Sequence, residues 1–271
     1  MIVVSKHYPN VGFVADDLMQ VVALHHRAIT RGTATARPDG SRLARLHDAP
    51  SGALLDVVVD GEGLVRSARP SFLAPAPCRV RVRLTGLLPD GNDPDADLVQ
   101  VAVLGGGYPL AVEFEGGFDA IAALPFDGGE ELDLELVGFA DALECYVDEQ
   151  AFRSSGIPLA TRDVLPAGLV PLRHGDGLAP VRASALVSGV VLACDELDNE
   201  LGGGRFLHLV VETDGMTFDA VVDPAAVDGA DVAEGRIVTG SLWFRARRPS
   251  PVEAGAAPAR PGLLRRFARR A

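Results

Sequence analysis

The sequence predicts a mainly β fold, with a small α+β unit at the N-terminus followed by two small antiparallel barrel modules. Three observations support this prediction. Short apolar runs alternate with glycine, proline and aspartate turns along most of the chain, a pattern typical of antiparallel strands. One long segment near the N-terminus has apolar residues at helical spacing. Two later stretches share one order: three strands, a short crossing and a final strand.

Length and composition narrow the class of protein. A chain of 271 residues with 48% hydrophobic residues has ample material for a packed core. No run approaches the about 18 uninterrupted apolar residues of a transmembrane helix, and the first apolar residues are too few for a secretory signal. Cys78, Cys145 and Cys194 are far apart and form no Cys-x-x-Cys pair, so we expect reduced thiols. These features predict a cytoplasmic protein.

Residues 1–75 are predicted to form the α+β unit. The helix is expected over 15–30, because its apolar residues share one face and Gly32 follows as a stop signal. Short strands separated by turn sequences predict an antiparallel meander beneath this helix. Residues 1–4 are expected as an edge strand, and the proline-rich stretch 70–77 as a linker.

The first barrel module is predicted over 78–150. Its strands are expected at 79–88, 98–104, 108–115 and 130–137, with a short helix at 118–124 and a closing segment at 143–147. Leucines at 132, 134 and 136 alternate with Asp133 and Glu135, and the strand before the helix carries Glu113 and Glu115 in the same way. This alternation predicts an acidic outer face, which would repel an oligonucleotide and accept a basic peptide or another protein.

A connecting segment is predicted over 151–180, with a short helix near 149–153, and the second module over 181–248. The second module repeats the order of the first. Gly86 and Gly189, inside the opening strands, are 103 positions apart, and Gly129 and Gly235, before the later strands, are 106 positions apart. The near-constant offset predicts an internal repeat.

Period-two alternation assigns the faces of the second module. Its apolar residues point into one core, and four side chains are left on the opposite face: Phe206, His208, Trp243 and Arg245. Two interpretations remain open. Another part of the chain covers this face, since large aromatic side chains are seldom left in water, or the face is a platform for a flat ligand or a peptide.

The order of elements in each module resembles the OB-fold, a five-stranded barrel with a short helix before its closing strands. The resemblance rests on order and spacing, not on a sequence motif. It implies binding through the face of the second and third strands, commonly of nucleic acid or oligosaccharide. Fold alone does not define function.

The C-terminus has a different composition. Residues 249–271 read as a flexible linker followed by a basic amphipathic tail, GLLRRFARRA. Its apolar candidate contacts are Leu263, Leu264 and Phe267, and its basic ones are Arg265, Arg266, Arg269 and Arg270. The conceivable receivers are the acidic faces of this same protein, an anionic membrane surface and an acidic partner. A solvated, silent tail is the remaining interpretation.

The sequence carries no recognisable catalytic, cofactor or metal motif. The acidic loops at 90–97 and 195–200 are interpreted as solvated turns; in the first, Leu98 stands where a calcium loop requires glycine. The six histidines show no ligand spacing. Nucleophile motifs and phosphate-binding glycine loops are also absent.

These observations favour a non-enzymatic cytoplasmic binding protein whose partner is another protein. One alternative is an enzyme or small-ligand binder with a site between the modules. The other is a single-stranded nucleic-acid binder that uses the aromatic face of the second module. The net charge of −12 disfavours nucleic acid as a partner of the whole protein.

Overall fold

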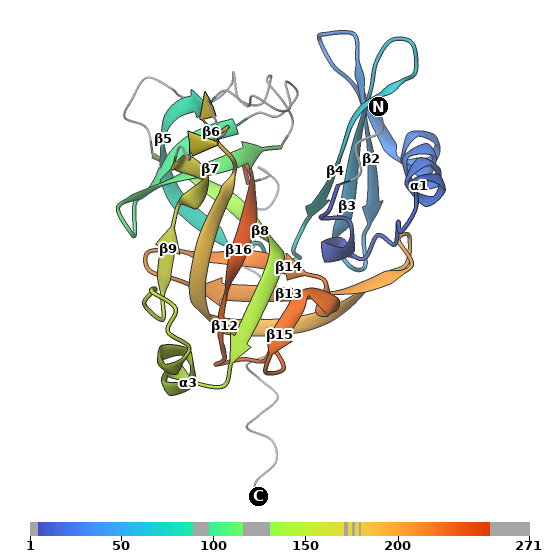
Figure 1. Cartoon of the computed structure of the whole chain (residues 1–271). Helices are drawn as coiled ribbons and strands as arrows, with labels where there is room; N and C mark the ends of the chain where they lie inside the picture. Colours follow the sequence, from blue (N-terminus) through green and yellow to red (C-terminus); the bar gives the residue numbers. More distant parts are fainter. Residues whose placement is uncertain are drawn as a thin grey trace, which may run out of the picture.

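The computed structural model describes residues 5–88, 98–115, 131–170, 173–174, 177–178 and 180–249. In this part of the chain the fold is mainly β, with an N-terminal helix lying beside a four-stranded sheet and a separate ten-stranded sheet (Figure 1). Four predicted features lie outside the described residues: the edge strand at 1–4, the acidic loop at 90–97, the helix at 118–124 and the basic tail.

The N-terminal unit contains η1 (Pro9–Val11) and α1 (Leu18–Arg31). The predicted helix is confirmed, although it begins at Leu18, because the Asp17 side chain accepts a hydrogen bond from the backbone N–H of Gln20 and caps the first turn. The buried residues of α1 recur at helical spacing: Val21, Leu24, His25 and Ala28. This stripe packs on β2 and β3.

The predicted meander is also present. Its strands are β1 (Thr33–Ala36), β2 (Arg42–Asp48), β3 (Ala53–Val59) and β4 (Val65–Phe72), antiparallel and in sequence order. The prediction that the linker begins at residue 70 was wrong, since β4 continues to Phe72. Pro70 fits there because β4 is an edge strand of its sheet, and a proline at an edge removes no ladder hydrogen bond.

The large sheet begins with β5 (Arg79–Leu88), β6 (Leu98–Val103), β7 (Tyr108–Phe114) and β8 (Glu131–Tyr146). It continues with β9 (Asp163–Leu165), β12 (Ser184–Asn199), β13 (Gly204–Glu212), β14 (Thr217–Val222), β15 (Val227–Gly229) and β16 (Ile237–Arg247). The smaller elements are α3 (Glu149–Ser154), η2 (Ala167–Leu169), β10 (Arg173–His174), β11 (Gly177–Leu178) and η3 (Pro224–Ala226). The short helix predicted near 149–153 is therefore confirmed.

Strand pairings in the large sheet close into two rings that share β8 and β16. In the first ring, β5, β6 and β7 form an antiparallel meander, and β7 then pairs parallel with β16. In the second, β12, β13 and β14 form the meander, and β14 pairs parallel with β8. β8 and β16 pair antiparallel with each other and with β5 and β12 respectively. Each predicted module thus contributes a strand to both rings.

β8 differs from the sequence prediction, which ended one strand at residue 137 and began another segment at 143. The structure has one continuous strand through Gly138. A Cβ added at Gly138 would lie 2.5 Å from the Leu242 side chain and 3.1 Å from that of Phe218. This glycine therefore permits close packing where the two rings meet, and does not mark a strand end.

Two hydrophobic cores stabilise the described chain. One lies inside the rings and is contributed by strands of both predicted modules. The other joins the N-terminal unit to the outer face of β8, β13, β14 and β16, with Phe72, Phe139 and Phe206 among its fully buried members. The N-terminal unit is therefore packed against the large sheet and is not an independent appendage.

Candidate functional site

The predicted binding face lies under the N-terminal unit. Phe206 is fully buried, His208 and Arg245 are nearly so, and Trp243 is half-buried against the same core. The residues that cover this face come from β4 and from the segment around η1, which contacts β13 and β14. The structure thus agrees with the interpretation in which another part of the chain covers the face. Ligand binding there stays a prediction.

His7 lies directly on the face. Its ring stacks on that of Trp243, with centroids 4.7 Å apart and planes inclined by 12°, and meets Phe139 edge-on. The guanidinium carbon of Arg245 lies 5.7 Å from the centroid of the Trp243 ring. Burial lowers the pKa of His7 to about 4, although Asp141 opposes the shift. His7 is therefore neutral near pH 7.

Two buried asparagines hold this segment in place. The Asn10 amide donates to the backbone carbonyl of Ala140 at 2.7 Å, and the Asn199 amide donates to that of Val11 at 2.7 Å. The backbone N–H of Val14 also donates to the carbonyl of Gly202. These bonds satisfy polar groups that the packing removes from water.

A His–Asp pair lies at the margin of the same face. His208 Nε2 is 2.8 Å from Asp219 Oδ1, and Asp219 Oδ2 accepts a hydrogen bond from the backbone N–H of Cys78 at 2.7 Å. The Phe72 ring packs on His208, with centroids 4.8 Å apart. Both carboxylate oxygens are therefore occupied by structural contacts. Local sequence pattern did not identify Asp219, although the register of β13 and β14 places it diagonal to His208.

The larger polar feature is an arginine–glutamate cluster between the N-terminal sheet and the large sheet. Its members are Arg45, Asp56, Arg69, Glu113, Glu115, Glu135, Arg245 and Arg247. Arg45 pairs with both oxygens of Asp56 at 2.7 Å, and Arg247 Nε donates to Glu135 at 2.8 Å. Four carboxylates face four guanidinium groups, so the formal charges within the cluster balance.

The predicted acidic face of the first module lies largely within this cluster. Glu113, Glu115 and Glu135 are buried, and arginines from β2, β4 and β16 surround them. The expectation of an open acidic surface was wrong at these positions, because the alternation identified the shared face but not the distant cations that cover it. Buried carboxylates require such partners.

The cluster also caps one edge of the N-terminal sheet. Arg245 Nη1 donates to the carbonyl of Pro70 at 2.6 Å, and Arg247 Nη2 donates to the carbonyl of Phe72 at 2.8 Å. Both carbonyls belong to β4. Because β4 is an edge strand, these bonds occupy backbone acceptors that would otherwise be open to another chain.

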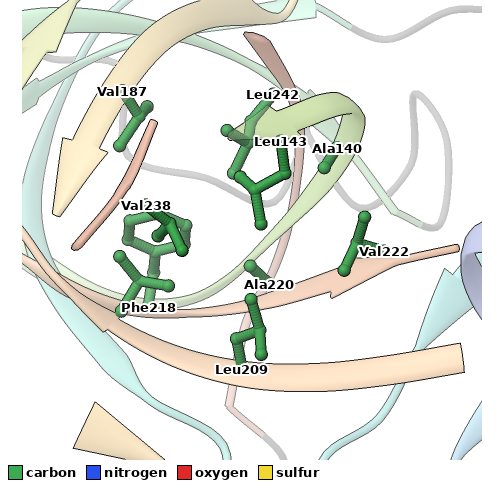
Figure 2. A pocket seen from close by; sticks show the side chains of 10 residues that line it. Ala140, Leu143, Val187, Leu209, Phe218, Ala220, Val222, Val238 and Leu242 are labelled. Carbon is green, nitrogen blue, oxygen red and sulfur yellow. The ribbon is translucent and has the colours of Figure 1, made fainter. Parts of the chain in front are cut away.

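The cavity inside the second ring offers no polar chemistry. Its volume is about 10 Å³, and its lining is apolar throughout, including Leu143, Val187, Phe218 and Val238 (Figure 2). A space of this size is near the minimum for one water molecule, which would also need about two to four polar partners. The cavity is therefore a packing gap and not a ligand site.

The exposed surface of the N-terminal unit is different. Three apolar side chains are exposed beside the buried stripe of α1: Leu18, Met19 and Val22, with Met19 at 73% exposure. We call these residues the α1 flank. Arg27, on the opposite side of the helix, contacts the carbonyl of Leu201 in the turn between β12 and β13. All four residues of β1 are exposed as well.

The remaining sequence predictions concern the C-terminal tail, the cysteines, metal binding and membrane helices. The tail contacts from Leu263 to Arg270 lie outside the described residues. All three cysteines are free, and burial raises the pKa of Cys145 and of Cys194. Among the residues that the structure describes, no group of three or more histidine, cysteine, aspartate or glutamate side chains is arranged to hold a metal ion. No described helix has the length and apolar character to cross a membrane.

No family model matches the chain, and no curated protein matches its sequence.

Proposed function

We propose that this chain is a non-enzymatic binding protein that recognises another protein through its N-terminal unit. The observation that carries the proposal is the difference between the two edges of the N-terminal sheet. The β4 edge is capped by Arg245 and Arg247, whereas β1 is exposed and pairs only with β2 in the described chain. The apolar α1 flank belongs to the same unit. Exposed apolar patches and open strand edges are both common protein-binding features.

The buried polar groups support binding over catalysis. Asp219 uses both oxygens in structural contacts, the formal charges of the arginine–glutamate cluster balance, and the cavity is small and lined by apolar side chains. An active site between the modules, the first alternative, would have to form where β8 and β16 pair along their lengths. That region is filled by close packing around Gly138, so the alternative has less support.

We further infer that the rings are two copies of one OB-like module that exchange their last strands. The pairing of β8 with β16 supports this. At an offset of 106 residues, Val137 of β8 corresponds to Trp243 of β16, and Phe139 corresponds to Arg245. The observed pair Val137–Arg245 is therefore equivalent to the observed pair Phe139–Trp243, as expected for two copies related by a twofold exchange. The parallel pairing of β8 with β14 and that of β16 with β7 occupy equivalent places in the two rings, although Glu113 and Val221 are 108 rather than 106 positions apart. A duplicated, interlocked scaffold would hold the N-terminal unit rigidly.

The nucleic-acid alternative has less support than protein binding. A single strand could stack on Trp243 only after His7 and the η1 segment had left the face. The net charge of −12 would oppose the approach of a phosphate backbone. We also propose a cytoplasmic location, because all three cysteines are free and disulfides are rare in that compartment.

Affinity capture from lysate of the native host tests the proposal. The bait proteins are the wild-type chain, Met19→Glu in the α1 flank, and Leu64→Glu as a control, because Leu64 is also exposed (62%) but lies in the turn before β4. We expect a partner that is retained by Leu64→Glu and lost with Met19→Glu. Equal capture by all three proteins, or turnover of a metabolite by the purified protein, would refute the proposal.

A further inference from the structure

We infer that β1 binds an extended, acidic segment of the partner protein as a fifth strand of the N-terminal sheet. The inference rests on the proposed function and specifies the chemistry of the partner. It depends on three observations: the direction of the β1 backbone groups, the absence of charges and other protective features within β1, and the charges around β1.

Register defines which β1 groups point outward. Thr33 to Ala36 pair with Arg45 to Arg42, and in the same register the N–H of Arg37 donates to the carbonyl of Ser41 at 2.9 Å. Hydrogen-bonded and non-bonded pairs alternate in antiparallel strands. Thr33 and Thr35 therefore bond to β2, and the N–H and C=O groups of Ala34 and Ala36 point away from it. A partner strand would find two donors and two acceptors there.

Among the described strands, β1 is an open edge without charges. In the large sheet, β9 and β15 are three-residue strands at the margin. The end of β12 pairs only with β13, and it carries the exposed acids Asp195, Glu196 and Asp198. The β4 edge is capped by the arginine–glutamate cluster. β1 has no proline, charge or bulge within it, and these are the features by which proteins usually protect an edge.

The charged side chains around β1 indicate which kind of partner strand would bind there. Arg31 precedes β1, Arg37 follows it, and Arg42 stands opposite Ala36. Arg31 and Arg42 are exposed. The nearby Asp39 is engaged by Arg66 at 3.3 Å. The edge is thus locally basic on a chain whose net charge is −12. An acidic strand complements it, whereas a second copy of this chain would bring arginines toward arginines.

The test uses two short peptides, one alternating valine with glutamate and the other alternating valine with lysine, titrated against the full chain. We expect the glutamate peptide to bind at low salt and the lysine peptide not to bind. Ala34→Pro removes an outward N–H that makes no bond within the described sheet, and should weaken binding about tenfold. Ala34→Val is its control, because it keeps the N–H and should bind like the wild type.

Arg42→Glu provides an independent variant in case the proline disturbs the strand. It should weaken the glutamate peptide about threefold at low salt, with a smaller effect at high salt. Equal binding of the two peptides, or equal binding by Ala34→Pro and Ala34→Val, would overturn the inference. Self-association that Ala34→Pro abolishes would also overturn it, in favour of a second copy, and sedimentation would reveal this.

Different experimental results would refute the proposed function and the addition of a strand at β1. A captured partner that is lost with Met19→Glu but retained by Ala34→Pro would leave the proposed function standing and refute strand addition at β1. Capture that none of these substitutions changes, together with no peptide binding, would refute both.

Discussion

The imidazole of His7 stacks on the indole of Trp243, with ring centroids 4.7 Å apart and planes inclined by 12°. This contact joins the start of the described chain to its last described strand. It places a flat side chain of the protein itself on the face for which the sequence left two interpretations open, coverage by another part of the chain or a platform for a flat ligand or a peptide. The packing of the N-terminal unit on the rings therefore depends on a small set of contacts that can be tested individually.

Acidification should weaken the folded state through His7. Its pKa is lowered by burial to about 4, against about 6.5 in an unfolded chain. Between these values the unfolded state binds the proton and the folded state does not, so stability falls as the pH decreases from about 6.5 to about 4. The loss from this group is about 3 kcal/mol at most. Urea titrations across this range, followed by Trp243 fluorescence, should show a flatter pH profile for His7→Phe. An unchanged profile would contradict the assignment.

Substitution at Gly12 should destabilise the contact between η1 and the β12–β13 turn. Gly12 has φ = 68°, and an added Cβ would lie 2.7 Å from the carbonyl oxygen of Gly204. Gly12→Ala should therefore cost about 1–3 kcal/mol. Gly61→Ala is the matched control, because nothing lies within 4 Å of its added Cβ, and it should be neutral or slightly stabilising. Equal unfolding free energies for the two variants would exclude tight packing at Gly12.

The arginine–glutamate cluster should be sensitive to the loss of one partner. Arg245→Met keeps much of the side-chain volume but removes the cation beside Glu113 and Glu115, so the free energy of unfolding should fall by about 3–5 kcal/mol. The control is Arg153→Met, which breaks an exposed helical pair with Glu149 and should cost about 0.5 kcal/mol or less. Similar losses in both variants would show that the buried cluster contributes no more than a surface pair.

Local pattern was enough to predict much of the N-terminal unit. The α1 stripe and the Gly32 stop identified the helix, and turn sequences located β1 to β3. Alternation also placed Phe206, His208, Trp243 and Arg245 on one face. These features depend on residues a few positions apart, where helix and strand periodicity operate.

The features that the sequence did not predict depend mostly on contacts between strands that are far apart in the chain. Nothing local shows that β8 and β16 take part in both rings, because Val137 of β8 pairs with Asp219, 82 positions away, and Arg245 of β16 pairs with Glu113, 132 positions away. The sequence prediction ended a strand at residue 137, although β8 continues through Gly138, where the packing leaves no space for a side chain. The carboxylates of β7 and β8 were identified, but Arg45 and Arg247 come from strands at opposite ends of the chain.

The most direct measurement is site-specific photocrosslinking in native-host lysate. A photoreactive side chain is placed in turn at Met19 in the α1 flank, at Ala34 in β1, and at Leu87 in the first ring, which is 53% exposed. We predict one partner crosslinked from Met19 and Ala34 and not from Leu87. Crosslinking from Leu87 alone would contradict binding through the N-terminal unit and locate the recognition surface on the rings.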